Sequence, residues 1–242
     1  MSIQRYLIAG LKVEIDVMGE LLRSRCEKYL NNFNGEPDMF INTSRENIDK
    51  IRKEAPSLSD EECEYIITGV LFYDKLLEFD GFLLHSSALS YNNKAYLFTA
   101  DPGTGKSTHV SLWKEYLGDE VEIINDDKPA VRLIDGEFYA IGTPWSGKTD
   151  QNNDIKIPIG SVAILYRNNE NVIESAKTNE SIIALLNQTV IPPERNGIDM
   201  MSELLDKFIR QTKIYKFGCD ISEQAVKTSF EGMTKEKYIK RI

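Results

Sequence analysis

Apolar positions along the chain follow two periods, and the change of period separates expected strands from expected helices. Short apolar runs rich in β-branched and aromatic residues, bounded by Gly, Asn, Asp or Pro, predict strands. Strands are expected at 6–17 (either continuous or with a break at Gly10), 38–42, 81–89, 95–99, 121–124, 136–140, 162–166 and 214–217. Apolar residues spaced three and four apart predict helices at 20–33, 44–55, 59–77, 108–117, 180–190, 202–212 and 223–233. This alternation predicts an α/β fold.

The expected strand at 95–99 and the expected helix at 108–117 are joined by a short loop that contains two glycines. The loop consists of Ala100, Asp101, Pro102, Gly103, Thr104, Gly105, Lys106, Ser107 and Thr108. It matches the phosphate-binding pattern G-x-x-x-x-G-K-[ST], except that Ala100 replaces the first Gly. A strand, this loop and a helix that ends at Gly118 form the arrangement that such a site requires.

Each residue type in this loop (the P-loop) has a physical reason. Gly103 and Gly105 allow a tight turn whose successive N–H groups face phosphate oxygens. Lys106 can reach the terminal phosphates, and the hydroxyl of Ser107 can ligate Mg²⁺. The loop therefore predicts a site for a nucleoside triphosphate and Mg²⁺, with residues 101–108 as the contacts. An ordinary turn before a helix is the alternative, and Ala100 keeps it open because Ala resists a positive φ.

An acidic pair follows the next expected strand. The strand at 121–124 leads directly into Asn125, Asp126, Asp127 and Lys128. Beside a phosphate-binding loop, such a pair supplies a carboxylate for Mg²⁺ or a catalytic base. Successive strand side chains alternate between faces, so we expect Asp126 and Asp127 to serve different partners. The residues alone do not assign the two roles, and a solvated Asp-rich turn is the alternative.

A single histidine lies in the apolar run before the P-loop strand. The run at 81–89 predicts a buried strand that carries His85, and the turn at 91–94 then leads into the strand at 95–99. These two strands form an expected hairpin, so part of the sheet is antiparallel. On its own, His85 is more typical of a hydrogen-bonded core histidine than of a catalytic one.

The order of these features resembles the catalytic domain of HPr kinase/phosphorylase, a family that shares its P-loop architecture with ATP-dependent phosphoenolpyruvate carboxykinase. The family's His-Gly motif is matched by His85-Ser86, its G-x-G-K-S loop by 103–107, and its V-A-D-D motif by 124–127. The resemblance covers residues 80–135 and implies a mixed-sheet P-loop domain of this type within the α/β class.

The resemblance also implies an activity, which is ATP-dependent phosphorylation of a hydroxyl. In the family, the second Asp is the general base, the first helps to place Mg²⁺, and the His supports the base. These roles fall on Asp127, Asp126 and His85, while Lys106 stabilises charge on the transferred phosphoryl group. The family forms hexamers, so the resemblance also raises the question of a homo-oligomer.

The sequence departs from the family at two places. The family's E-[IV]-R-G-x-G segment has no clear match, and residues 140–148 stand in its approximate place. This stretch resembles small HPr-kinase-like proteins of unassigned substrate. Within it, Trp145 offers a stacking face and Lys148 a partner for phosphate, although a structural turn with a packed Trp is an equal alternative. The region that performs the family's reverse phosphorolysis is not recognisable, so we expect neither phosphorylase activity nor HPr as the substrate.

One further residue is a candidate for binding phosphate. Arg195 lies in an expected turn at 193–197, after the helix at 180–190. A solvated arginine is the favoured alternative.

Composition narrows the class of protein. The 242 residues carry a net charge of −9, which argues against nucleic acid or an anionic membrane as the main partner. Three widely separated cysteines without metal-ligand spacing are typical of reduced thiols, and no apolar run reaches membrane-spanning length. We therefore expect a cytoplasmic protein.

The length suits one compact domain with a smaller region attached. Residues 1–78 are expected to form an N-terminal α+β region, and 79–242 the P-loop kinase-like domain. In the first region Thr43 or Ser44 can cap a helix, and Ser59 with Glu62 forms a capping box. No chemical motif occurs there, so a scaffold is favoured over a wall of the substrate pocket.

The sequence as a whole predicts an ATP- and Mg²⁺-dependent kinase. The acceptor is expected to be a Ser or Thr hydroxyl of a peptide or protein, or a small alcohol metabolite. A non-catalytic module that binds nucleotide or peptide is one alternative, and a carboxykinase-like enzyme or a plain nucleotide switch are others. The motifs do not distinguish ATP from GTP.

Overall fold

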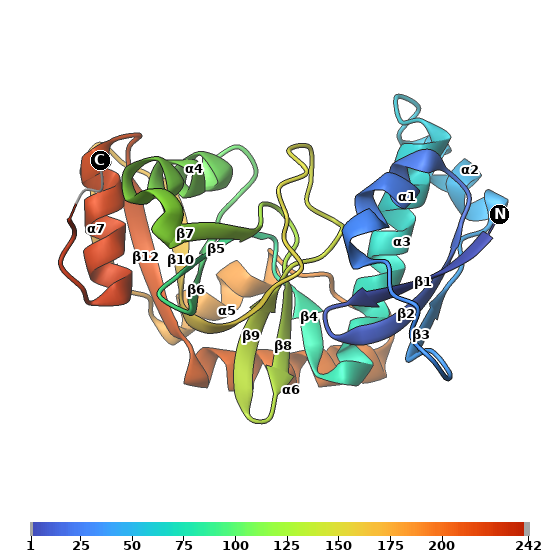
Figure 1. Ribbon diagram of the computed structural model, residues 1–242. Helices are drawn as coiled ribbons and strands as arrows, with labels where there is room; N and C mark the ends of the chain where they lie inside the picture. Colours follow the sequence, from blue (N-terminus) through green and yellow to red (C-terminus); the bar gives the residue numbers. More distant parts are fainter. Residues whose placement is uncertain (1, 240–242) are drawn as a thin grey trace.

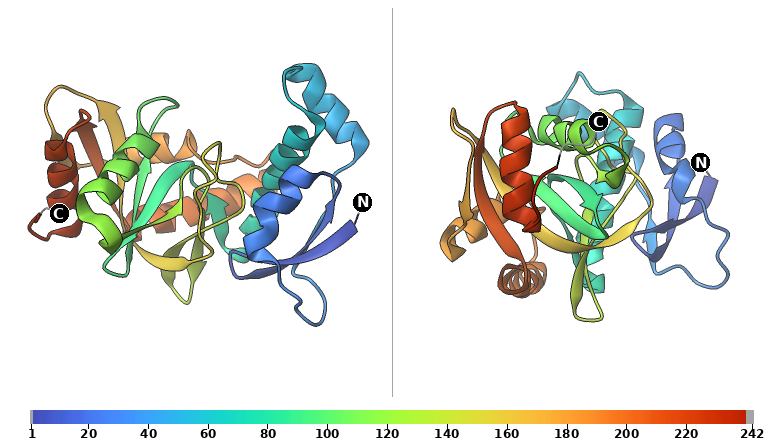
Figure 2. Two further views of the ribbon diagram at one scale, coloured as in Figure 1. Left: turned by 45° about the horizontal axis from the view of Figure 1, so that its top comes forward. Right: turned by 60° about the vertical axis from the view of Figure 1, so that its left-hand side comes forward.

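A computed structural model describes residues 2–239 and contains two β-sheets (Figure 1). A three-stranded sheet with helices α1 to α3 lies at one end of the molecule, and α4 and α7 lie at the other end (Figures 1 and 2). In the part of the chain described, no helix is both long enough and apolar enough to cross a membrane.

The N-terminal sheet begins with a hairpin. Strands β1 (Ser2–Ile8) and β2 (Leu11–Val17) are antiparallel, and Ala9 and Gly10 between them have φ values of 53° and 76°. Such a two-residue turn with both φ angles positive matches the twist of a hairpin. Of the two alternatives, the break at Gly10 is therefore confirmed. Strand β3 (Met39–Ile41) adds to β2 in parallel.

The helices of this region follow their capping signals, with one exception. Helix α2 (Arg45–Glu54) is capped by Ser44, and α3 (Asp60–Leu76) has the expected capping box of Ser59 and Glu62. The helix expected at 20–33 is shorter: α1 (Glu20–Cys26) and the 3-10 turn η1 (Glu27–Tyr29) end where Leu30 bridges to Tyr6 of β1. Pairing with the sheet thus ends the helix.

A buried carboxylate links these helices. Glu64 of α3 is 1 % exposed, and its two oxygens accept hydrogen bonds from the N–H groups of Met18 and Gly19, each at 2.7 Å. These residues stand at the start of α1, where N–H groups lack partners within the helix. Glu64 therefore caps α1 from another helix.

The large sheet is mixed and holds nine strands. After the 3-10 turn η2 (Leu77–Phe79), its strands along the chain are β4 (Gly81–Leu83), β5 (Ser86–Tyr91), β6 (Lys94–Thr99), β7 (Val121–Asn125), β8 (Ala130–Ile134), β9 (Glu137–Ile141), β10 (Lys156–Arg167), β11 (Val172–Ser175) and β12 (Lys213–Cys219). The order is β4-β8-β9-β10-β6-β5-β7, and β12 joins β10 to β11. Strand β10 runs parallel to β6 and β12 but antiparallel to β9, which confirms the expected mixed α/β class.

The prediction of a single strand at 81–89 is wrong. The strand is interrupted at Leu84 and His85, because β4 pairs with β8 whereas β5 pairs with β6 and β7. The expected hairpin into the P-loop strand is confirmed, and Asn92 and Asn93 form its turn with φ values of 47° and 57°.

Helices cover both faces of this sheet. Helices α4 (Lys106–Leu117), which ends in the 3-10 turn η3 (Gly118–Glu120), and α7 (Glu223–Thr234) share one core cluster with the sheet; α5 (Thr178–Leu186) and α6 (Arg195–Gln211) share another. The turn expected at 193–197 is instead the first turn of α6, and the helix expected at 180–190 ends four residues early.

The N-terminal region shares its core with the rest of the chain. Ile141, the last residue of β9, and Trp145, in the loop that follows, belong to the same apolar cluster as Tyr6, Leu22 and Phe72 of the N-terminal region. The loop between β9 and β10, residues 142–155, stands between the two ends of the molecule (Figure 1). Asn152 of this loop is 3 % exposed, and its side-chain oxygen accepts a hydrogen bond from the hydroxyl of Tyr29 at 2.9 Å.

Candidate active site

The P-loop joins β6 to α4 as expected from the sequence. Gly103 and Gly105 have φ values of 76° and 119°, which only Gly adopts without strain. Gly105 precedes the first turn of α4, which in the described chain receives no side-chain cap. Its N–H groups are therefore available to an anion. Ala100 is not among the residues of 2–239 with positive φ, so its methyl group does not disturb the loop.

The side chain of Lys106 folds back onto the P-loop. Its Nζ donates a hydrogen bond to the carbonyl of Ala100 at 3.0 Å, and the residue is 9 % exposed. Burial lowers the pKa of Lys106, and the charges of Asp127 and Asp101 act against that shift. The ammonium group therefore lies in a partly desolvated position where an added phosphate would stabilise its charge.

His85 and Asp127 meet at the break between β4 and β5. His85 Nε2 lies 2.7 Å from Asp127 Oδ1, and the other carboxylate oxygen accepts a bond from the ammonium group of Lys128. The main chain of His85 is fixed on both sides, since its N–H donates to the carbonyl of Gln188 and its carbonyl accepts from Thr99. The strand break thus places the His85 ring against the acidic pair.

These partners keep Asp127 ionised. Burial acts to raise its pKa, but the hydrogen bond from His85 and the charge of Lys128 outweigh burial and lower the pKa to about 2. Asp127 is therefore a carboxylate at any pH near neutrality.

The two aspartates have different partners, as the sequence predicted. Asp126 Oδ2 accepts a hydrogen bond from Thr149 at 2.8 Å, whereas Asp127 contacts His85 and Lys128. The cause is the turn after β7 rather than strand alternation. The side-chain oxygen of Asn125 accepts from the N–H groups of Asp127 and Lys128, at 2.9 and 2.7 Å.

Ser107 lies near the main chain of Asp126, with the hydroxyl of Ser87 between them. The hydroxyl of Ser87 donates to the carbonyl of Asp126 at 2.9 Å and lies 3.5 Å from the hydroxyl of Ser107. A hydroxyl and a carboxylate are the oxygen ligands that Mg²⁺ takes from a protein when phosphates and waters supply the rest. Within residues 2–239 no cluster of three or more His, Cys, Asp or Glu could hold a metal by itself.

The loop after β9 contains Trp145 and Lys148, two of the residues considered as substrate contacts. Trp145 is 1 % exposed; its ring stacks on Phe72 at 4.8 Å and packs edge-on to Tyr73. The structure therefore favours the alternative of a structural turn with a packed Trp, because helix α3 covers the ring, although Trp145 still lines a small cavity. Lys148 is exposed in the same loop. Hydrogen bonds from Ser59 lower the pKa of Glu62 in α3, and the charge of Lys148 adds to that shift.

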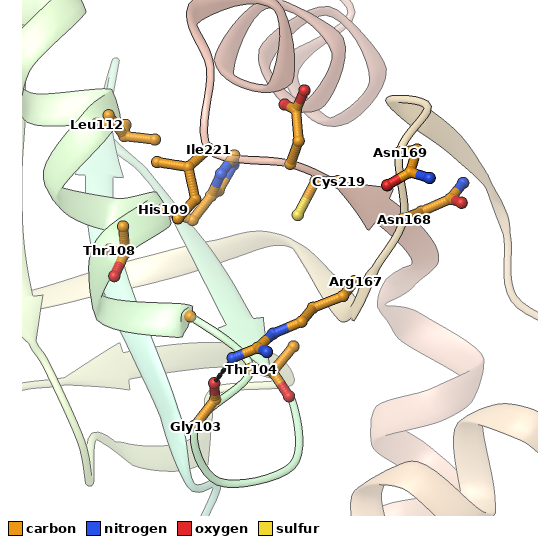
Figure 3. Close-up of a pocket in the computed structure, with 12 residues that line it drawn as sticks. Gly103, Thr104, Thr108, His109, Leu112, Arg167, Asn168, Asn169, Cys219 and Ile221 are labelled. Atoms are coloured by element: carbon orange, nitrogen blue, oxygen red, sulfur yellow. Dashed lines mark hydrogen bonds between the residues drawn. The ribbon is translucent and has the colours of Figure 1, made fainter.

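Arg195 does not join the site residues described above. It is exposed at the first position of α6, and that helix packs on the opposite side of the sheet from α4. A different arginine lies on the P-loop: Arg167, at the end of β10, donates a hydrogen bond to the carbonyl of Gly103 at 2.6 Å (Figure 3). Sequence reasoning missed Arg167, and also missed Lys128 and Asn125, although Asn before two Asp is a typical turn signal.

A cavity of about 730 Å³ opens beside the P-loop. It lies outside the carboxyl ends of the parallel strands β6, β10 and β12, where open α/β sheets bind ligands. The side chains of Leu112 and Ile221 face it together with the amides of Asn168 and Asn169 (Figure 3). Its volume is in the range of cavities that hold small ligands.

We compared the chain with protein-family models, with curated protein sequences and with solved structures, and matches came from the solved structures. No protein-family model matches the chain, and no curated protein sequence matches it. Among solved structures, the HPr(Ser) kinase/phosphatase from Coxiella burnetii matches with 12 % sequence identity, over 53 % of this chain and 97 % of that one, and a TM-score of 0.28.

Proposed function

We propose that the protein is a kinase that transfers the γ-phosphoryl group of ATP to a hydroxyl. One observation supports the proposal above all: Thr99, at the end of the strand that leads into the P-loop, bonds to the carbonyl of His85 at 2.9 Å, and the ring of His85 lies 2.7 Å from Asp127. A phosphate-binding loop beside a partly buried carboxylate that is paired with a histidine is the arrangement that phosphoryl transfer to a hydroxyl needs.

Each residue of the site has a proposed role in this reaction. The N–H groups of the P-loop and Lys106 bind the β- and γ-phosphates, and the cavity beside the loop accommodates the nucleoside. Ser107 and Asp126 would hold Mg²⁺, which when bound neutralises charge on the phosphates. Asp127 accepts the proton of the acceptor hydroxyl, and His85 orients the carboxylate through the 2.7 Å contact.

Lys128 gives this site a way to activate its base. A carboxylate with a pKa near 2 is a weak proton acceptor, and Lys128 contributes to that low value. A bound triphosphate competes for the ammonium group of Lys128 and adds negative charge, and both changes raise the pKa of Asp127. The carboxylate thus becomes more basic when the phosphoryl donor is in place.

Titration calorimetry with a non-hydrolysable ATP analogue tests the proposal. We expect Mg²⁺-dependent binding that is lost in Lys106→Ala and retained in Lys114→Ala, a matched change of a half-exposed lysine in the same helix. Absence of binding to the unmodified protein would refute the kinase function and favour an interaction module.

A further inference from the structure

A second cavity, of about 170 Å³, lies next to the neighbour of the proposed base. Lys128, the neighbour of Asp127, forms part of its wall, and so does Leu83, two residues before His85. Helix α3 contributes Tyr65, Ile66, Gly69, Val70 and Tyr73, and the β9–β10 loop contributes Trp145. An acceptor whose hydroxyl lies at Asp127 therefore has this cavity within reach.

The aromatic wall of the cavity has no free polar group. The hydroxyl of Tyr73 donates to the carbonyl of Lys128. The hydroxyl of Tyr65 donates to the carbonyl of Pro144 at 3.1 Å and accepts from the N–H of Ser146 at 3.0 Å. Trp145 Nε1 donates to the carbonyl of Tyr65 at 3.1 Å. A sugar or polyol buried here would leave hydroxyl groups unsatisfied, at a cost of ~1–3 kcal/mol each.

The size and rim of the cavity fit one apolar side chain. An apolar cavity of about 150 Å³ holds a benzene molecule, so 170 Å³ is the size of a Leu, Ile or Phe side chain. Ile66 and Val70 are 40 % and 48 % exposed and lie one helical turn apart, so they extend the apolar surface outward from the cavity. Such exposed side chains are available for contact with an incoming chain.

We infer that the phosphoryl acceptor is a polypeptide that inserts an apolar side chain into this cavity and presents a nearby Ser or Thr hydroxyl to Asp127. The inference rests on the proposed kinase function. In the step, the hydroxyl oxygen forms a bond to the γ-phosphorus while the bond to the bridging oxygen breaks. The proton passes to Asp127, and the bonding electrons leave with ADP.

Phosphorylation of a Ser-centred peptide library tests the preference. With labelled ATP, we expect peptides with Leu, Ile or Phe at one position near the Ser to react at least about tenfold faster than peptides with Asp there, as a hydrophobic pocket allows. Val70→Lys should remove this preference without changing nucleotide affinity. Ile183→Lys should leave it intact, because Ile183, 61 % exposed, lines a different cavity of about 440 Å³ beside the P-loop.

Several results would overturn the inference while leaving the kinase function standing. They are equal rates for apolar and acidic peptides, transfer to glycerol or sugars but not to peptides, or a preference that Ile183→Lys removes and Val70→Lys does not. Absence of transfer to every acceptor, with nucleotide still bound, would overturn both.

A binding measurement that needs no catalysis separates the two claims. The chain has two tryptophans, Trp113 and Trp145, so fluorotryptophan labelling gives two ¹⁹F resonances. A capped seryl-leucine dipeptide should shift the Trp145 signal but not the Trp113 signal, in Lys106→Ala as in the unmodified protein. The seryl-aspartate counterpart should shift neither. An unmoved Trp145 signal would show that the cavity takes no apolar side chain, whatever the kinase assay gives.

Discussion

Replacing Asp127 by Asn tests the centre of the proposed mechanism, because the change removes the charge and keeps the shape. General bases contribute about 10²–10⁴-fold to rate, so we expect the rate of phosphoryl transfer to fall by that factor, or ~3–5 kcal/mol of activation free energy. Binding of the ATP analogue should persist, since the N–H groups of the P-loop and Lys106 remain.

The same variant has a predicted cost in stability. Asp127 is 22 % exposed, and its pKa falls from 3.8 to about 2 on folding. At 1.36 kcal/mol per pH unit, this difference corresponds to ~2.5 kcal/mol of stability. A depressed folded-state pKa stabilises the protein above the unfolded value of 3.8, and the contribution is lost as the pH falls through about 2. Asp127→Asn should therefore lower the free energy of unfolding at pH 7 by up to that amount, and by less at pH 3.

The assay is transfer of labelled γ-phosphoryl to the peptide library and to water, with urea unfolding measured at both pH values. Asp119→Asn, an exposed carboxylate in η3, is the matched control. Asp127 is ionised at neutral and alkaline pH even when bound ATP raises its pKa from about 2, so its replacement should lower the rate by the same factor at pH 7 and at pH 9. A rate within threefold of the unmodified protein would refute its role as base. A factor that differs between pH 7 and pH 9 would contradict an ionised Asp127.

Three further changes test the surrounding structure. Arg167→Ala should weaken binding of the ATP analogue about tenfold in calorimetry, because a charged group is lost from the P-loop; an unchanged Kd would contradict a role in binding. Ala100→Gly should leave that Kd unchanged and lower the free energy of unfolding by about 0.4–1 kcal/mol in urea, since Ala100 has no positive φ; tighter binding would show that the methyl group distorts the loop. Glu64→Gln should cost ~1–3 kcal/mol in the same unfolding assay, because one of two N–H groups at the start of α1 loses its acceptor; Glu61→Gln should cost less, because Glu61 is exposed and accepts a longer bond, at 3.1 Å, from the N–H of Glu20, and equal effects would argue against the buried cap.

The parts of the site that the sequence predicts are encoded locally. The P-loop, the acidic pair after β7 and the hairpin turn at Asn92 and Asn93 each depend on residues within a few positions of one another. Their spacing therefore carries the geometry directly. The meeting of His85 with Asp127 was expected only through a family resemblance, since 42 positions separate the two residues.

The errors concern features that distant partners decide. The run at 81–89 is apolar throughout, so no change of period marks the break at His85, which arises because β4 and β5 have different neighbours in the sheet. The sequence left open whether Trp145 stacks on a substrate or packs within its loop, and a distant element decides this, because α3 buries its ring. Arg167 reaches Gly103 only because β10 lies beside β6.

The loop between β9 and β10 has a consequence for how this protein can be divided. N-terminal side chains hold it at several points: Arg25 pairs with Asp150 at 2.6 Å, and Lys28 and Tyr29 bond to Asn152 at 2.8 and 2.9 Å. The same loop supplies Thr149 to Asp126. A fragment that starts at residue 79 keeps every chemical motif yet loses the anchors of the loop that steadies its acidic pair. The first 78 residues therefore cannot be removed or exchanged as an independent module, and an engineered chimera would have to transfer them together with the loop.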